Sequence, residues 1–290
     1  MNLLVFDSGI GGLGVVRQIR QLQPAANILY LADNAFYPYG EKPDDVLIAR
    51  ILQIVRAGVQ HTQPDAVVIA CNTASTVALA HLREAIALPF IGCVPPIKPA
   101  AAASRTRHIG LLATAATIRR PYLADLVQRF AGDCTLHSHG TAILADLAEA
   151  KFRGQALNPA DLEAAIAPLL TQPDAELIDS IALGCTHYTF LLPELLALRP
   201  HIKWFDPASA VARQTATVTN NPSANPHPNP VMAGLDPAGP PPAIHALPSK
   251  NRPHHELAIN TAFFTADLPD LTEMRANLQQ YGFTQLLALN

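Results

Sequence analysis

The fold is decided by the stretch Val67-Val68-Ile69-Ala70-Cys71-Asn72-Thr73, a short apolar run that ends in a thiol, an amide and a hydroxyl. A run of this length is typical of a strand that is covered on both faces of a sheet. The same pattern occurs again as Ile181-Ala182-Leu183-Gly184-Cys185-Thr186-His187. We therefore interpret the two stretches as equivalent parts of a duplicated chain.

Strands and helices alternate around both stretches, which predicts parallel sheets with right-handed crossovers. Each strand of the first half has a counterpart in the second half at a nearly constant separation. Besides the two stretches quoted, we expect strands at 3–6, 28–31, 89–94, 108–114, 135–138 and 202–205. We expect helices at 13–21, 46–60, 75–87, 122–130, 144–151, 161–170 and 191–198. The prediction is an α/β fold with two pseudo-symmetric α/β domains, each with a four-strand parallel sheet and with the active site between them.

We expect the first domain to comprise residues 1–97 plus about 210–290, and the second to comprise residues 98–209. Residues 217–256 are rich in proline, which predicts an irregular insertion. Its histidines show no fixed ligand spacing, so we interpret them as parts of a solvated loop and not as a metal site; they are His227, His245, His254 and His255. A strand at 259–265 and a helix at 268–281 are expected to return to the first domain.

Composition excludes several classes of protein. Charged residues make up 15% of the chain and the net charge is -3, so no basic face for nucleic acid is indicated. No signal peptide and no apolar run long enough for a bilayer are present, so we expect no membrane partner. The four cysteines form no close pair, which predicts neither disulfides nor a zinc site. A cytoplasmic protein with reduced thiols is expected, and its oligomeric state is left open, with a homodimer as one alternative.

Ligands of open parallel sheets bind at the carboxyl ends of the strands. If the two halves face one another, Cys71 and Cys185 approach one ligand from opposite sides. A thiol on each face of one carbon can remove a proton and return another with inversion, which predicts a racemase that needs no cofactor. The thiolate is the competent base, and the N–H groups at the start of the next helix would favour this anion. Asp7 and His187 are candidates to carry protons to and from the thiols.

Less specific interpretations of these residues stay open. Asp7 could cap the helix after the glycine-rich turn, and His187 could be a core histidine. The polar residues Ser8, Asn72, Thr73 and Thr186 suit a zwitterion with carboxylates, although serine and threonine after a strand are also common caps. Cys93 and Cys134 lack the matched context of Cys71 and Cys185, so we interpret them as inert thiols.

One motif favours a different enzyme. The run Gly9-Ile10-Gly11-Gly12-Leu13-Gly14 fits the dinucleotide-binding pattern after a strand, with Asp33 at the end of the next strand. An NAD-dependent oxidoreductase is therefore an alternative. However, Asp7 would place a carboxylate where a pyrophosphate must lie, and the pattern leaves both cysteine stretches unexplained. No lysine has a context that indicates a pyridoxal Schiff base.

Six motifs resemble those of the glutamate racemases in the aspartate/glutamate racemase superfamily. They are FDSGIGGL (6–13), ADNAFYPYG (32–40), ACNTAS (70–75), PIKPA (96–100), LATAAT (112–117) and LGCTHY (183–188). The sequence departs from the family pattern at Ala115, where a proline is usual, and at Gly140-Thr141, where a Cys-Pro pair is common.

The resemblance implies cofactor-independent interconversion of L- and D-glutamate, which supplies D-glutamate for peptidoglycan. It assigns the catalytic thiols to Cys71 and Cys185, the first acting on D-glutamate and the second on L-glutamate. It assigns proton relay to Asp7, His187 and Glu149. It assigns substrate contacts to Asp7, Ser8, Tyr39, Gly40, Asn72, Thr73 and Thr186. A racemase of aspartate or another amino acid, and a glutamate-binding protein without activity, stay open as alternatives.

Overall fold

The computed structural model describes residues 1–220, 260–266 and 271–288. From residue 221 on, the predicted irregular stretch lies outside the described residues, and so do its four histidines. For residues 217–220 the prediction was wrong, because they form the end of helix α10 (Ala208–Asn220).

The first domain is built on a 6-stranded parallel sheet with the order β10-β9-β2-β1-β3-β4. Its strands are β1 (Asn2–Asp7), β2 (Asn27–Ala32), β3 (Ala66–Ile69), β4 (Phe90–Gly92), β9 (Thr261–Phe264) and β10 (Gln285–Ala288). The expected four-strand sheet was wrong here, because β9 and β10 extend it beyond β2. The predicted return of the C-terminal segment to this domain is confirmed by the pairing of β9 with β2.

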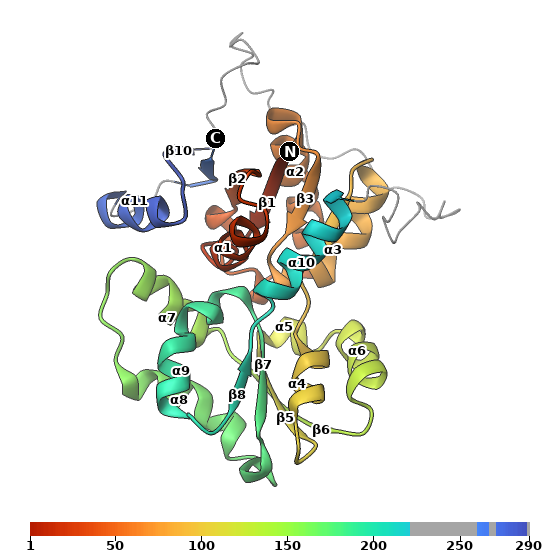
Figure 1. Cartoon of the computed structure of the whole chain (residues 1–290), viewed down its shortest axis with the longest axis vertical. Coiled ribbons are helices and arrows are strands. Elements are labelled where there is room, and N and C mark those ends of the chain that lie inside the picture. The colour runs from red at the N-terminus through yellow and green to blue at the C-terminus, as the bar shows by residue number, and fades with distance from the viewer. Residues whose placement is uncertain (221–259, 267–270, 289–290) are drawn as a thin grey trace.

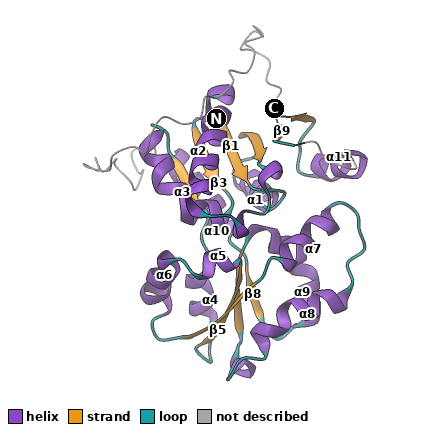
Figure 2. Cartoon of the chain, turned by 180° about the vertical axis from the view of Figure 1, so that it is seen from behind, coloured by secondary structure: helices purple, strands orange, loops and turns teal. Residues whose placement is uncertain are grey.

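The second domain has a 4-stranded parallel sheet with the order β6-β5-β7-β8. Its strands are β5 (His108–Ala113), β6 (Thr135–Gly140), β7 (Ser180–Gly184) and β8 (Lys203–Phe205). The order repeats the β2-β1-β3-β4 part of the first sheet strand for strand, so the predicted duplication is confirmed. The two domains lie one above the other (Figures 1 and 2). The boundaries 1–97 plus about 210–290, and 98–209, stay a prediction.

Helices cover both faces of each sheet. Those of the first domain are α1 (Leu13–Leu22), α2 (Asp44–Thr62), α3 (Asn72–Ala85), α10 and α11 (Leu271–Gln280). Those of the second are α4 (Ile97–Ala103), α5 (Ala115–Ile118), α6 (Pro121–Ala131), α7 (Ile143–Phe152), α8 (Pro159–Leu170) and α9 (Leu192–Leu198). Short 3-10 helices are η1 (Asn34–Phe36), η2 (Tyr39–Glu41), η3 (Ala175–Leu177) and η4 (Thr186–Leu191). Within the described ranges, each helix is too short or too polar to cross a membrane.

The apolar strands explain the layers. Leu3 and Val5 of β1 pack into one core cluster while Leu4 and Phe6 pack into another, because successive strand side chains point to opposite faces. All four are fully buried. The same alternation divides Ile181 and Ala182 of β7 between the two cores of the second domain. Parallel strands covered in this way leave their carboxyl ends as the place where polar side chains collect.

Candidate active site

A cavity of about 190 Å³ lies where residues that follow strands of both sheets meet. Ser8 follows β1 and Cys71 follows β3, while Thr114 follows β5 and Cys185 follows β7. Eight of the residues predicted for the site line this cavity: Ser8, Tyr39, Gly40, Cys71, Asn72, Thr73, Cys185 and His187. The other three, Asp7, Glu149 and Thr186, are buried beside it and are not part of its lining.

The Cys71 thiol lies at the start of α3. The N–H of Ala74 donates to Cys71 Sγ at 3.5 Å, and Ser8 Oγ lies 3.7 Å from the same sulfur. Burial and the nearby charge of Asp7 raise the pKa of Cys71, and the Ala74 N–H offsets only part of this effect. The helix N-terminus therefore contacts the sulfur as predicted, but burial outweighs it and favours the protonated thiol.

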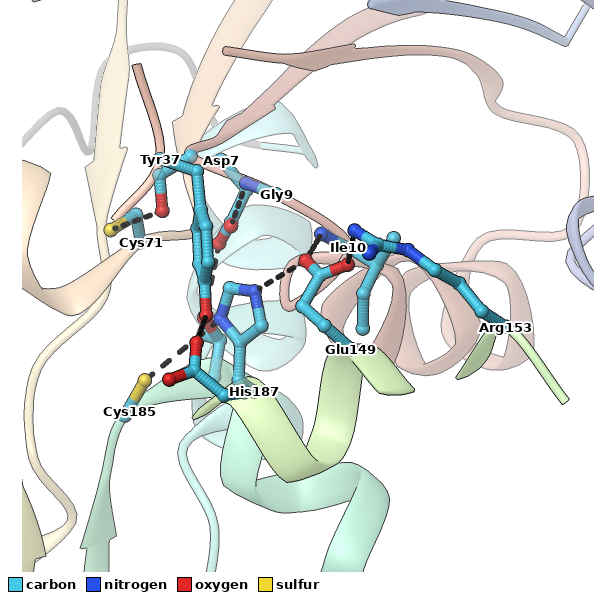
Figure 3. Close-up of polar contacts among 12 residues, drawn as sticks. Asp7, Gly9, Ile10, Tyr37, Cys71, Glu149, Arg153, Cys185 and His187 are labelled. Carbon is cyan, nitrogen blue, oxygen red and sulfur yellow. Dashed lines mark hydrogen bonds and ion pairs between the residues drawn. The ribbon is translucent and has the colours of Figure 1, made fainter. Parts of the chain in front are cut away.

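The Cys185 thiol has a different partner. Its sulfur lies 3.9 Å from His187 Nδ1, and His187 Nε2 lies 3.0 Å from Glu149 Oε1 (Figure 3). Cys185 and His187 line the cavity, while Glu149 is held behind them on α7. A thiol, an imidazole and a carboxylate thus form a continuous path for a proton.

Burial disfavours the charged form of His187, but contacts with Cys185 and Glu149, together with the charge of Asp7, outweigh it. The pKa of His187 is therefore well above its ordinary value. Burial would raise the pKa of Glu149, but the hydrogen bonds from His187 and from the N–H of Ile10, with the charge of Arg153, leave it below its ordinary value. Both pKa shifts favour an imidazolium paired with a carboxylate, next to the Cys185 sulfur.

Asp7 is fully buried. Its Oδ1 accepts the N–H of Gly9 at 2.9 Å, and its Oδ2 accepts the hydroxyl of Thr186 at 3.0 Å. Burial raises the pKa of Asp7, although the charge of His187 and these two hydrogen bonds oppose the shift. The alternative that Asp7 caps α1 was wrong, because the N-cap is Gly12 and no side chain caps it.

Side chains of the second domain lie very close to the glycine-rich turn at Gly9 and Gly11. A Cβ on Gly9 would lie 2.5 Å from Glu149 Oε1 and 2.8 Å from His187 Nε2. A Cβ on Gly11 would lie 2.5 Å from Thr186 Oγ1 and 2.6 Å from His187 Nδ1. Contacts this short require glycine, so the turn lets Glu149, Thr186 and His187 approach the first domain closely.

Asp33, the acidic residue of the apparent dinucleotide pattern, has partners of its own. Arg50 donates to both of its oxygens, at 2.6 and 2.9 Å. The hydroxyls of Tyr39 and Thr265 donate to it at 2.7 and 2.6 Å. Together with the close contacts at Gly9 and Gly11, these bonds account for Asp33 and two of the glycines of the pattern without a nucleotide.

The family model described as Asp/Glu/Hydantoin racemase matches residues 13–215. The chain belongs to this family. Glutamate racemase of Granulibacter bethesdensis is 53% identical over 218 residues, which cover 75% of this chain and 78% of that protein. Glutamate racemase of Actinobacillus pleuropneumoniae serotype 5b is 39% identical over 290 residues, covering 100% and 98%. The resemblance inferred from the motifs is confirmed, and the protein is an enzyme of the racemase class.

Comparison with solved structures supports the same family assignment. Escherichia coli glutamate racemase, in complex with L-glutamate and the activator UDP-MurNAc-ala, matches with a TM-score of 0.81 and 36% identity. The match covers 99% of this chain and 97% of that one. The predicted fold class is therefore confirmed over nearly the whole chain.

Sequence reasoning missed several residues in and around this cavity. Tyr37 lines the cavity and its hydroxyl donates to Asp146 Oδ1 at 3.0 Å. Arg153 donates to Glu149 Oε2 at 3.0 Å. Thr114 also lines the cavity, and its place after β5 corresponds to that of Ser8 after β1. The helical spacing of Glu149 and Arg153, and the equivalence of Thr114 with Ser8, were signals that could have found two of them.

The two remaining cysteines lie outside the cavity lining. Cys93 is fully buried after β4, and burial raises its pKa well above the ordinary value. Cys134 lies beside the exposed Asp133. Neither thiol has a histidine partner among the hydrogen bonds of the described residues, so their interpretation as inert thiols stays the simplest one.

Proposed function

We propose that this enzyme interconverts L- and D-glutamate with two cysteine bases, Cys71 and Cys185, and without a cofactor. The observation that carries the proposal is that these two thiols follow equivalent strands, β3 and β7, and line one cavity from two domains. An α-carbon between them could lose its proton to one sulfur and gain a proton from the other.

One thiolate removes the α-proton, and the electron pair moves toward the adjacent carboxylate. The opposite thiol then donates its proton to the other face of the carbon, which inverts it. Each turnover exchanges the protonation states of the two sulfurs. His187 is placed to restore the state of Cys185, and Asp7 is the corresponding acid or base near Cys71.

The cavity lining suits a zwitterion with two carboxylates. Both side-chain polar atoms of Asn72 are buried and lack a partner among the described residues, which leaves the amide free to bind substrate. The hydroxyls of Ser8 and Thr73 line the same cavity. The substrate itself is inferred from the relatives, which include an Escherichia coli glutamate racemase solved with L-glutamate.

From the family resemblance we further propose that the enzyme works in the cytoplasm, where it supplies D-glutamate for peptidoglycan synthesis. The proposed domain boundaries, 1–97 plus about 210–290 and 98–209, place one catalytic cysteine in each domain. We propose the same substrate contacts that the family resemblance implies. Asp7 and Thr186 are hydrogen-bonded to each other behind the residues that line the cavity.

Proton NMR of the protein with L-glutamate in D2O tests this function. We expect the α-proton signal to disappear while chiral chromatography detects D-glutamate. Cys71→Ala and Cys185→Ala should each abolish the formation of D-glutamate, whereas Cys93→Ala and Cys134→Ala should retain most activity. Binding without loss of the α-proton would contradict the proposal in favour of a binding protein. Faster exchange of aspartate than of glutamate would contradict the assigned substrate.

A further inference from the structure

Tyr37 packs beside the surroundings of the Cys185 thiol. It lies between η1 and η2 and lines the cavity. Its ring centroid is 5.4 Å from that of His187, with the planes at 39°. The ring also packs against the core cluster that contains Cys185. In Figure 3 the ring stands beside the imidazole.

A hydrogen bond to the other domain holds this ring in place. The Tyr37 hydroxyl donates to Asp146 Oδ1 at 3.0 Å. Asp146 lies one turn before Glu149 on α7, so the same helix holds Tyr37 through one carboxylate and His187 through the other. Burial and the charge of Asp146 raise the pKa of Tyr37, which keeps its hydroxyl protonated as a donor.

The Cys71 side is built differently. Its sulfur contacts the Ser8 hydroxyl and the Ala74 N–H instead of an imidazole. The tyrosine in its own core cluster, Tyr39, donates to Asp33 and not to the second domain. A ring beside His187 would keep water from the imidazole of this residue, which is 2% exposed. A proton taken up by Cys185 would therefore exchange with solvent slowly while the substrate is bound.

We propose that Tyr37 is a positioning residue for the Cys185 half of the reaction, with its ring shielding the Cys185–His187 pair and Asp146 anchoring the ring. This inference rests on the proposed function, because it assumes that each sulfur works on one face of glutamate. Tyr37 lies within the ADNAFYPYG stretch (32–40), and the resemblance assigns it no role.

The ring is tested by Tyr37→Leu in D2O, with the deuterium content of both enantiomers measured by mass spectrometry. The readout is deuterium in the recovered starting enantiomer divided by deuterium in the inverted product. This ratio does not depend on the amount of active enzyme, so partial misfolding leaves it unchanged. We expect the ratio to rise severalfold when the substrate is L-glutamate, the enantiomer assigned to Cys185, and to stay at the wild-type value for D-glutamate.

The anchor is tested by two variants that each remove the hydrogen bond between Tyr37 and Asp146. Tyr37→Phe keeps the aromatic ring, and Asp146→Ala keeps the whole tyrosine. Each should raise the deuterium ratio for L-glutamate by a similar amount. The ratio of the double variant, Tyr37→Phe with Asp146→Ala, should not exceed that of either single variant. Asp146→Asn retains an acceptor oxygen and should keep the wild-type ratio. Tyr122→Phe is the matched control, because Tyr122 is an exposed tyrosine on α6 outside the cavity lining.

Several results would overturn the inference. An unchanged deuterium ratio in Tyr37→Leu, or an equal rise for both enantiomers, would contradict the claim that Tyr37 shields the Cys185 side alone. The claim that Asp146 anchors the ring would be contradicted if the increases of the two single variants multiplied in the double variant. It would also be contradicted if Asp146→Asn gave the same deuterium ratio as Asp146→Ala. If the wild-type enzyme shows no inversion of glutamate, the proposed function itself fails; if it inverts glutamate and only the variants disagree, this inference alone fails.

Discussion

Glu149 Oε1 lies 3.0 Å from His187 Nε2, and both side chains are buried behind the Cys185 thiol. The carboxylate comes from α7 and the imidazole from the segment after β7. The N–H of Ile10, from the first domain, donates to the same oxygen at 3.1 Å. The proton path of one thiol is thus assembled from both domains.

Replacing the carboxylate by an amide tests this path. Glu149→Gln keeps the shape but removes the charge that stabilises the imidazolium. We expect kcat to fall about a hundredfold, the lower end of what general acid–base catalysis contributes. Glu163→Gln, which alters a surface ion pair with Arg199, is the control and should retain kcat. A wild-type kcat in Glu149→Gln would contradict the relay.

The same variant predicts a pH dependence of stability. The folded-state pKa of His187 is raised above its ordinary value of 6.5, so its contribution is complete below that pH and is lost as the pH rises through the folded value. The pKa of Glu149 is lowered from 4.5, so its contribution is present above that pH and is lost as the pH falls through the folded value. The stability lost in Glu149→Gln, measured by urea unfolding, should be largest between about pH 4.5 and 6.5. A loss that does not vary with pH would contradict the charged pair.

The glycine turn gives a steric prediction. Gly9→Ala places a methyl group 2.5 Å from Glu149 Oε1 and 2.8 Å from His187 Nε2, so the pair must move. We expect kcat to fall by roughly a hundredfold, as displacements of about 1 Å at a reacting centre can cause. Gly14→Ala is the control, because its Cβ would meet only Thr189, at 3.4 Å, and alanine favours the helix. Equal activity in the two variants would show that the turn tolerates side chains.

Asp33 should matter for stability. Arg50→Met removes both guanidinium bonds to a carboxylate that is fully buried. We expect a loss of about 3 kcal/mol in the free energy of unfolding, as for other buried carboxylates that lose their partner. Arg199→Met, which breaks a surface ion pair, should cost less than about 1 kcal/mol. Denaturant unfolding measures both, and equal costs would show that Asp33 does not depend on Arg50.

The sequence predicted most of the fold because its strands are nearly continuous apolar runs. The duplication around Cys71 and Cys185 followed from that pattern, whereas the order of the strands within each sheet did not. The missed helix α10 has a readable apolar face, since Val211, Ala212 and Val218 pack against α1, but it runs into the proline-rich stretch that hid its end. Strand β10 is a short segment at the edge of the sheet, where the local pattern is weakest.

From the sequence, the site was predictable only for residues that come directly after a strand. Cys71, Cys185 and their polar followers could be placed at one edge from the parallel topology alone. Glu149 came from the resemblance, because helical spacing does not show that α7 approaches His187. Tyr37 and Asp146 are far apart in sequence and belong to different domains, so their hydrogen bond could be found only in three dimensions.

The central claim is that Cys71 and Cys185 act from opposite faces of one carbon. A proton taken by one sulfur stays on that side of the substrate, and the other sulfur, already equilibrated with solvent, supplies the replacement. The most direct measurement is the deuterium content of each glutamate enantiomer over the first few percent of conversion in D2O, an arbitrary early window. We predict deuterium in the inverted product and protium in the recovered substrate. Equal early deuterium in both pools would indicate a single base and would contradict the two-cysteine mechanism.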